Sequence, residues 1–145
     1  KKGNILDCTE NIIVHQVNSQ GVMGGGLARQ LADKYKGLEP FYFEHCREKN
    51  NSYQILSGTV LFYGDVNNRR KIANIFSQKE NFNTDYKAMK IALKEVKQYA
   101  KDIKLSIAIP YGIGCGIANG NWDKVYKIIE QVFSDYKVIL YKLED

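Results

Sequence analysis

The chain has 145 residues and a net charge of +5, and its 44% apolar and 26% charged residues are typical of a globular protein, which excludes intrinsic disorder. No apolar run approaches the roughly 18–20 residues that a membrane-spanning helix needs. The cysteines Cys8, Cys46 and Cys115 are few and widely spaced, which predicts free thiols rather than disulfides or a zinc site. No apolar signal-peptide segment follows Lys1, so we expect a cytoplasmic location.

The positive charge suits an anionic partner, although general solubility is the simpler explanation. The lysines are scattered, mostly at helical spacing, and form no basic arm or run of five. This pattern does not indicate a nucleic-acid-binding module. No repeat, linker or shift in composition is visible, so residues 1–145 are predicted to form a single domain, and we expect a monomer.

Hydrophobic periodicity predicts five strands and four helices. Short β-rich runs mark the strands, and apolar residues that recur every three or four positions mark the helices. Pro40 fits a first helical turn, and Asn83 or Thr84 is expected to cap the longest helix. The predicted strands are Asn11–Val17, Gly58–Tyr63, Lys71–Phe76, Leu105–Ile109 and Lys137–Lys142. The predicted helices are Gly26–Tyr35, Pro40–Lys49, Asp85–Lys101 and Trp122–Phe133.

The order of these elements predicts the fold class. Strands alternate with helices except at one hairpin, where Asp65–Asn68 supplies turn residues. This order favours an α/β fold, a three-layer α/β/α sandwich with a mixed, mostly parallel central sheet. Ligands of such sheets bind beyond the carboxyl ends of the strands. Two glycine-rich loops directly follow predicted strands, so they can converge on one ligand.

The first loop, residues 18–28, has three consecutive glycines at a predicted helix start. Gly24, Gly25 and Gly26 let a ligand approach the backbone closely. They also leave N–H groups directed outward at the positive end of the helix dipole. An anion is the expected guest, although a tight strand-to-helix turn would require the same glycines for its geometry alone.

The second loop, residues 110–122, has four glycines within nine residues: Gly112, Gly114, Gly116 and Gly120. This density is typical of a backbone nest for oxygen anions. A glycine-rich surface loop without a ligand is the alternative, and the loop matches neither the Walker A nor the GxGxxG pattern. Two such loops after buried strands predict an anion-binding cleft more strongly than either loop alone.

Together these motifs resemble those of the macrodomain family. Asn18 followed by Gly24-Gly25-Gly26-Leu27-Ala28 resembles the family's Asn and GGG-(V/L/I)-A helix start, and Gly3-Asn4-Ile5 resembles its GDI motif. Gly114-Cys115-Gly116 followed by Trp122 resembles the GCG…W loop of one branch. That branch contains terminal ADP-ribose protein glycohydrolases, antitoxins that remove ADP-ribose from DNA, and short phage or bacterial ADP-ribose-1″-phosphate phosphatases. The resemblance covers nearly the whole chain.

The resemblance implies a site for ADP-ribose. Asn4 and Ile5 would meet the adenine, Leu143 would pack near the adenosine, and Asn18 would bind the distal ribose as the one candidate catalytic residue. The two glycine-rich loops would clamp the diphosphate and the distal ribose. The candidate ligand-binding residues are Asn4, Ile5, Asn18, Ser19, Gly21, Met23, Gly24, Gly25, Gly26, Leu27, Ser77, Gln78, Tyr111, Gly112, Ile113, Gly114, Cys115, Gly116, Ile117, Ala118 and Leu143.

The chain departs from the family at positions that matter for chemistry. Asn4 stands where the family usually has Asp, so its hydrogen bond to adenine would lack charge assistance. The glycohydrolase branch uses a Lys in the strand after the hairpin and an acid just after the GCG motif. Ser77 and Ala118 occupy those positions here, and Lys79 is two residues off. A Schiff-base mechanism through a lysine is therefore not expected.

Other chemistry-bearing side chains have structural alternatives. His15 lies in a buried-looking strand, where a fully hydrogen-bonded core histidine is commoner than a general acid or base. Cys115 has no histidine placed near it by sequence, so the fit of a small side chain explains it better than a nucleophilic role. Gln78 points either into the cleft or away from it. Tyr111 and Phe82 are either stacking surfaces for a base or ribose or core residues.

The resemblance predicts a macrodomain that binds ADP-ribose and hydrolyses ADP-ribose-1″-phosphate at the distal ribose, without a metal or other cofactor. The alternatives are a non-catalytic ADP-ribose reader and a hydrolase that removes ADP-ribose from protein or nucleic acid. A further alternative is a nucleic-acid-binding module that uses the +5 charge. The expected partners are ADP-ribose or a derivative and, as a candidate, an ADP-ribosylated macromolecule; no membrane partner is expected.

Overall fold

The computed structural model describes residues 1–64 and 69–143, and one five-stranded sheet forms its centre. The strand order is β2-β3-β1-β4-β5, with β2 antiparallel to β3 and the other neighbours parallel. The strands are β1 (Ile12–Val17), β2 (Val60–Tyr63), β3 (Lys71–Phe76), β4 (Ile107–Pro110) and β5 (Ile139–Tyr141). The predicted mixed, mostly parallel sheet is confirmed. The predicted hairpin turn Asp65–Asn68 lies outside the described residues.

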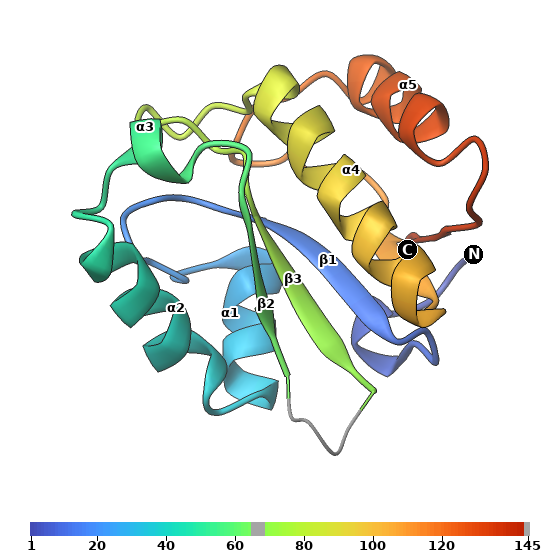
Figure 1. The fold of residues 1–145 in the computed structure, drawn as a ribbon, viewed down its shortest axis with the longest axis horizontal. Coiled ribbons are helices and arrows are strands. Elements are labelled where there is room, and N and C mark those ends of the chain that lie inside the picture. Colours follow the sequence, from blue (N-terminus) through green and yellow to red (C-terminus); the bar gives the residue numbers. More distant parts are fainter. Residues whose placement is uncertain (65–68, 144–145) are drawn as a thin grey trace.

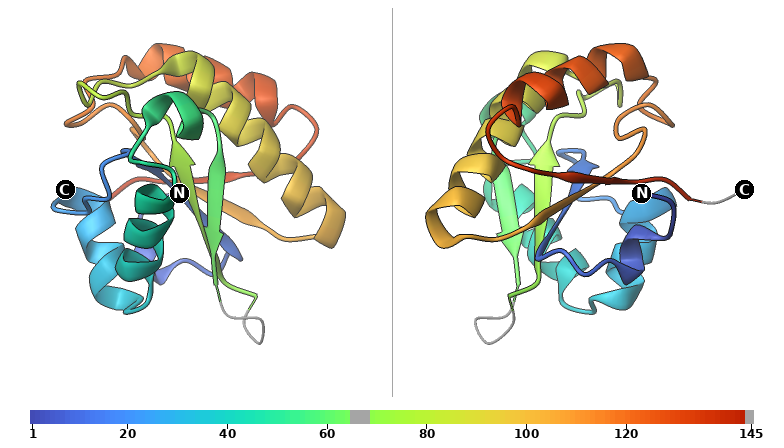
Figure 2. Two further views of the ribbon diagram at one scale, coloured as in Figure 1. Left: turned by 60° about the vertical axis from the view of Figure 1, so that its left-hand side comes forward. Right: turned by 90° about the vertical axis from the view of Figure 1, so that its right-hand side faces the viewer.

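Helices cover both faces of the sheet, which confirms the three-layer α/β/α sandwich (Figure 1). The helices are α1 (Gly26–Lys34), α2 (Leu38–Glu48), α3 (Tyr53–Leu56), α4 (Tyr86–Ile103), α5 (Trp122–Val132) and the 3₁₀-helix η1 (Ile5–Asp7). Helices α4 and α5 lie on one face, and α1 and α2 lie on the other (Figure 2). Among the described residues no helix is long and apolar enough to cross a membrane.

Strand β1 divides the core because its side chains alternate between the two faces. Ile12 and Val14 pack in the cluster beneath α4 and α5, whereas Ile13 and Val17 pack beneath α1 and α2. All four are buried. A strand buried on both faces reads as a continuous apolar run, which is why this segment was predictable from sequence.

The prediction for the cap of α4 was wrong, because Asp85 caps this helix rather than Asn83 or Thr84. Asp85 Oδ1 accepts a hydrogen bond from Ala88 N at 3.1 Å, and its Oδ2 accepts one from the Tyr53 hydroxyl at 3.0 Å. The Thr84 hydroxyl instead donates to Gly114 O at 2.6 Å. Asn83, Thr84 and Asp85 are all of residue types that cap helices, and tertiary contacts determine that Asp85 is the cap.

Two further differences concern helix starts and single turns. Helix α2 begins at Leu38 rather than Pro40, so Pro40 is its third residue. Proline is tolerated there because the first-turn N–H groups have no partner within the helix. The one-turn helices η1 and α3 were not predicted, since three or four residues show no periodicity. All three cysteines are free thiols, as predicted.

We predict that Asp85→Ala lowers the free energy of unfolding by about 1–2 kcal/mol, because it removes the cap of α4 and leaves the Tyr53 hydroxyl without its acceptor. Urea denaturation followed by circular dichroism measures this change. Asp85→Asn is the matched control, since it keeps the capping oxygen and should lose less. Equal stability of wild type and Asp85→Ala would contradict the role of this cap.

Candidate functional site

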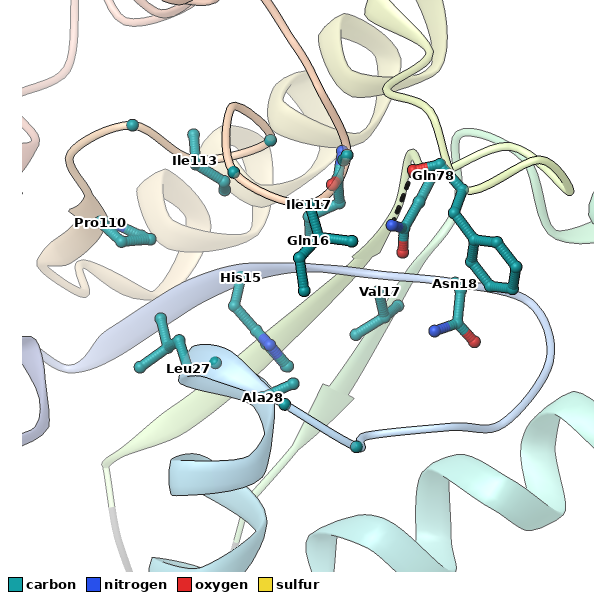
Figure 3. Close-up of a pocket in the computed structure, with 18 of the residues that line it drawn as sticks. His15, Gln16, Val17, Asn18, Leu27, Ala28, Gln78, Pro110, Ile113 and Ile117 are labelled. Atoms are coloured by element: carbon teal, nitrogen blue, oxygen red, sulfur yellow. Dashed lines mark hydrogen bonds between the residues drawn. The ribbon is translucent and has the colours of Figure 1, made fainter.

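A cavity of about 550 Å³ opens where β1 and β4 end (Figure 3). The end of β1 forms its floor, with the start of α1 on one side and the second glycine-rich loop on the other. The segment between β3 and α4 contributes Gln78 and Phe82. The two glycine-rich loops therefore do converge on one cavity, at the carboxyl ends of parallel strands.

Most of the residues predicted to bind the ligand line this cavity. Those that do are Asn18, Gly24, Gly25, Gly26, Leu27, Gln78, Tyr111, Gly112, Ile113, Gly114, Gly116, Ile117 and Ala118. The open alternative for Gln78 is thereby settled, since this residue faces the cavity. The sequence reasoning did not assign Gln16, Val22 or Pro110 to the site, although they also line it.

Eight predicted site residues lie outside the lining. Asn4 caps η1, where its Oδ1 accepts a hydrogen bond from Leu6 N at 3.0 Å. Leu143 is 65% exposed to solvent. Cys115 is half-buried and packs against the core beneath α4 and α5. The remaining five are buried in or beside the core: Ile5, Ser19, Gly21, Met23 and Ser77.

The two loops bring unpaired backbone donors to the cavity. Among the described residues, the N–H groups of Gly24, Gly25, Gly26 and Leu27 have no backbone or side-chain acceptor. In the second loop, the N–H groups of Gly114, Gly116, Ile117 and Ala118 also have no acceptor among the described residues. Gly24, Gly25, Gly26, Gly116 and Ile117 are exposed, so their N–H groups are accessible beside the cavity, where they can bind an anion with several oxygens.

The second loop is held in place by Thr84. The Gly114 carbonyl accepts from the Thr84 hydroxyl at 2.6 Å and from Gly120 N at 2.8 Å, while Thr84 N donates to Ala118 O at 2.9 Å. A Cβ on Gly114 would lie 2.9 Å from Thr84 Oγ1, and the φ of Gly114 is 75°. Only glycine therefore fits at this point of contact.

Gln16 extends this network from β1. Its Nε2 donates to Thr84 Oγ1 at 3.2 Å and to Ser77 Oγ at 3.0 Å. Ser77 is thus a buried support of the cavity wall rather than part of its surface. Gln16 is the last residue but one of β1, and its place at the carboxyl end of this strand was the available sequence signal.

Asn18 shapes the first loop. Its Oδ1 accepts hydrogen bonds from Gln20 N and from the Tyr42 hydroxyl, both at 2.9 Å, and its Nδ2 donates to Val22 O at 2.9 Å. Burial raises the pKa of the Tyr42 hydroxyl well above its ordinary value, so this group acts as a neutral donor. Asn18 therefore lines the cavity and also fixes the path of the chain toward Gly24.

His15 is buried in the cavity wall and is only half satisfied, contrary to the expectation of a fully hydrogen-bonded core histidine. His15 Nε2 lies 2.6 Å from Asn74 Oδ1. The Asn74 amide donates to the Leu61 carbonyl at 2.8 Å, so its oxygen faces His15 and the proton of His15 sits on Nε2. Nδ1 is then an acceptor, and it is the one buried side-chain atom without a partner among the described residues.

The ionisable groups of the cavity are few. Its lining contains no carboxylate, lysine or arginine, and His15 and Tyr111 are its titratable side chains. Burial lowers the pKa of His15 to about 4, so its ring is uncharged at neutral pH. Burial raises the pKa of the Cys115 thiol, which argues against a thiolate nucleophile. Among residues 1–64 and 69–143 no cluster of His, Cys, Asp and Glu could hold a metal ion.

Two aromatic residues stand at the rim rather than in the core. Tyr111 is 44% exposed and Phe82 is 45% exposed, and both line the cavity. The Tyr111 ring packs against Trp122 with centroids 4.6 Å apart, and Lys142 Nζ lies 4.8 Å from its centre. Gln78 Nε2 donates to the Phe82 carbonyl at 2.8 Å. Phe82 is therefore free to stack on a flat ligand group, whereas the Tyr111 ring already contacts Trp122 and Lys142.

We predict that His15 makes stability fall by about 2 kcal/mol between pH 7 and pH 5. The folded pKa of about 4 is below the ordinary value of 6.5, so the unfolded state binds more protons within this window. The stability that depends on an uncharged His15 is fully present above pH 6.5 and is lost as the pH falls toward 4. Urea denaturation of wild type and His15→Gln at several pH values measures the difference. An identical pH dependence in both proteins would contradict the prediction.

The sequence of this chain is similar to those of known proteins. The sequence profile of the Macro domain matches residues 14–129. ADP-ribose glycohydrolase OARD1 of Bos taurus is 24% identical over 98% of this chain and 89% of its own length. ADP-ribose 1″-phosphate phosphatase of Saccharomyces cerevisiae is 26% identical over 98% of this chain and 96% of its own.

A solved structure agrees with the profile. The macrodomain of Mycobacterium tuberculosis DarG superposes with a TM-score of 0.82 at 20% identity, covering 99% of this chain and 94% of that one. This likeness shows the fold. Because the profile spans most of the chain, both glycine-rich loops included, the chain belongs to the Macro domain family.

Proposed function

We propose that this chain binds the ADP-ribose portion of its ligand in the cavity and hydrolyses ADP-ribose-1″-phosphate at the distal ribose. The observation that carries the proposal is the pair of unpaired N–H sets lining one cavity. The names of the relatives, a glycohydrolase of ADP-ribose and a phosphatase of its 1″-phosphate, support the choice of ligand and of reaction.

The two loops suit a diphosphate between them. Gly24–Leu27 supplies N–H groups at the positive end of the α1 dipole, and the loop from Gly114 to Ala118 supplies others from the opposite wall. The cavity volume of about 550 Å³ is in the range of small-molecule and cofactor sites. Phe82 stacks on the base or a ribose.

The chemistry rests on positioning and uncharged groups. A water attacks the terminal phosphorus, the bond from phosphorus to the ribose oxygen breaks, and the products are inorganic phosphate and ADP-ribose. The N–H groups stabilise the charge that develops, and Asn18 orients the distal ribose. His15 Nδ1 is buried, so His15 supports the cavity wall and does not contact the water or the ribose.

A non-catalytic reader of ADP-ribose is the second candidate. The observation that favours it is the absence of any carboxylate or lysine from the cavity lining. A reader would need only the N–H sets and a stacking surface, and the lining of the cavity supports this candidate. The two candidates therefore share the binding site and differ in turnover.

Calorimetry and a phosphate assay separate the candidates. We expect ADP-ribose to bind at least tenfold more tightly than AMP, because AMP lacks the diphosphate that spans both loops. Release of phosphate from ADP-ribose-1″-phosphate then distinguishes an enzyme from a reader. Binding that does not distinguish ADP-ribose from AMP would contradict the proposed site, and binding without phosphate release would establish the reader.

Asn18→Ala is expected to lower the rate of phosphate release by about tenfold to a hundredfold, since the distal ribose loses its orienting amide. The affinity for ADP-ribose should change less than the rate. Steady-state kinetics and calorimetry on the same preparation supply both numbers. Asn18→Asp keeps the oxygen that accepts from Gln20 and Tyr42 but loses the donor to Val22 O, so it separates the contributions of the two ends of the amide. Full activity of Asn18→Ala would remove this residue from the mechanism.

Thr84→Val is expected to weaken ADP-ribose binding by about tenfold, because the Gly114 carbonyl loses its hydroxyl donor and the second loop loosens. Thr84→Ser retains that donor and should bind within about twofold of wild type. Calorimetry of both variants tests the anchor. Wild-type affinity in Thr84→Val would show that the loop does not depend on it.

A further inference from the structure

Five lysines form a line along α4, away from the cavity. We call Lys87, Lys90, Lys94, Lys97 and Lys101 the lysine ridge; each is exposed or partly exposed. At about 100° per residue, their spacing of three and four confines them to an arc of about 80° on the helix surface. At about 1.5 Å per residue the line is about 21 Å long.

The net charge of the protein is concentrated in the same layer. Residues 86–137, from α4 through α5, hold nine of the 17 lysines but only five of the 16 acidic residues. This segment therefore carries four of the five net positive charges. Helices α4 and α5 pack side by side on one face of the sheet, so the excess charge lies on one side of the molecule (Figure 2).

Salt bridges neutralise the lysine ridge only at its C-terminal end, at Lys97 and Lys101; we call Lys87, Lys90 and Lys94 the upper ridge. Asp135 pairs with Lys97 at 3.0 Å and with Lys101 at 2.8 Å, and these lysines hold the pKa of Asp135 at about 2. Among the described residues, Lys87, Lys90 and Lys94 form no salt bridge.

The side-chain contacts around Lys87 and Lys90 involve neutral or positive groups, and Glu95, which follows Lys94, forms no salt bridge among the described residues. Lys90 Nζ is 3.4 Å from Gln131 Oε1, and Lys124 adds its charge above the Tyr86 ring, 5.4 Å from the centroid. Like charges three and four residues apart on a helix repel one another, so this arrangement costs stability in the free protein.

We propose that the lysine ridge binds the phosphodiester backbone of a nucleic acid. A line of charges at intervals of about 4.5–6 Å complements a polymer with one negative charge per residue. Lysine presents a point charge rather than the planar fork of arginine, which suits contacts to phosphate that are independent of base sequence.

The surroundings of the ridge favour a nucleic acid over a membrane. The apolar face of α4, which includes Met89, Leu93 and Val96, is fully buried against the sheet. A membrane-binding helix inserts such a face into the lipid, whereas the large exposed apolar residues of α4 are Ile91 and Ile103, which lie far apart along the helix and form no face. No ridge lysine lines the cavity, so binding at the ridge does not require ADP-ribose.

Fluorescence anisotropy with labelled 12-nucleotide single-stranded RNA, single-stranded DNA and duplex DNA tests the proposal. The probe variant is Lys87→Gln/Lys90→Gln/Lys94→Gln. The control, Lys2→Gln/Lys36→Gln/Lys49→Gln, removes three exposed charges elsewhere. We expect the ridge variant to bind at least tenfold more weakly at low salt, and the slope of log K against log salt to fall by about 2–3. The control should stay within threefold of wild type.

Three results would overturn the proposal. They are no binding of any of the three nucleic acids, equal weakening in both variants, and tighter binding to anionic phospholipid vesicles than to nucleic acid. Saturating ADP-ribose should leave the affinity of the ridge unchanged. A failure of ADP-ribose to bind at all would contradict the proposed function but would not affect the proposal that the lysine ridge binds nucleic acid.

Discussion

The site depends on backbone N–H groups that the fold leaves unpaired. Most of these groups are on exposed residues, so they are accessible to a ligand when the surrounding structure holds them in place. Here β1 and β4 run parallel and end at the same edge of the sheet, which brings both glycine-rich loops to one cavity. Thr84 then fixes the second loop at Gly114 and Ala118. Strand direction, glycine and one hydroxyl together produce the anion site.

The rest of the cavity is notable for uncharged chemistry. His15 is neutral because it is buried, and its tautomer follows from the hydrogen bond between Asn74 and the Leu61 carbonyl on the neighbouring strand. The amide of Asn18 is also oriented before a ligand arrives, by its hydrogen bonds to Gln20, Tyr42 and Val22. With no carboxylate or lysine in the wall, binding and turnover both rest on dipoles and positioning. Positive charge lies elsewhere, above all on the outer surface of α4.

Much of the fold followed from sequence because the strong signals agree with the tertiary structure. β1 is apolar on both faces, and α4 repeats its apolar residues over five turns, so both were predictable. The cap of α4 was not, because Asn83, Thr84 and Asp85 are all good caps and only the Tyr53 contact distinguishes Asp85. Single-turn helices such as α3 are too short to show a period.

The site was predictable where backbone chemistry defines it and less so where side-chain direction does. The glycines mark the loops whatever the surrounding structure. Ser77 was assigned to the cavity, yet its hydroxyl turns inward to Gln16. The state of His15 depends on Asn74, which is 59 residues away in sequence and pairs with it in the sheet. The lysine ridge is visible as a spacing, but its lack of acidic partners required the position of α5.

The most direct test is amide chemical-shift mapping during a titration with ADP-ribose. If the diphosphate lies between the loops, the N–H resonances of Gly24–Leu27 and of Gly114–Ala118 shift downfield together and saturate at one ligand per chain. Shifts confined to one loop, or absent from both, would contradict a shared anion site.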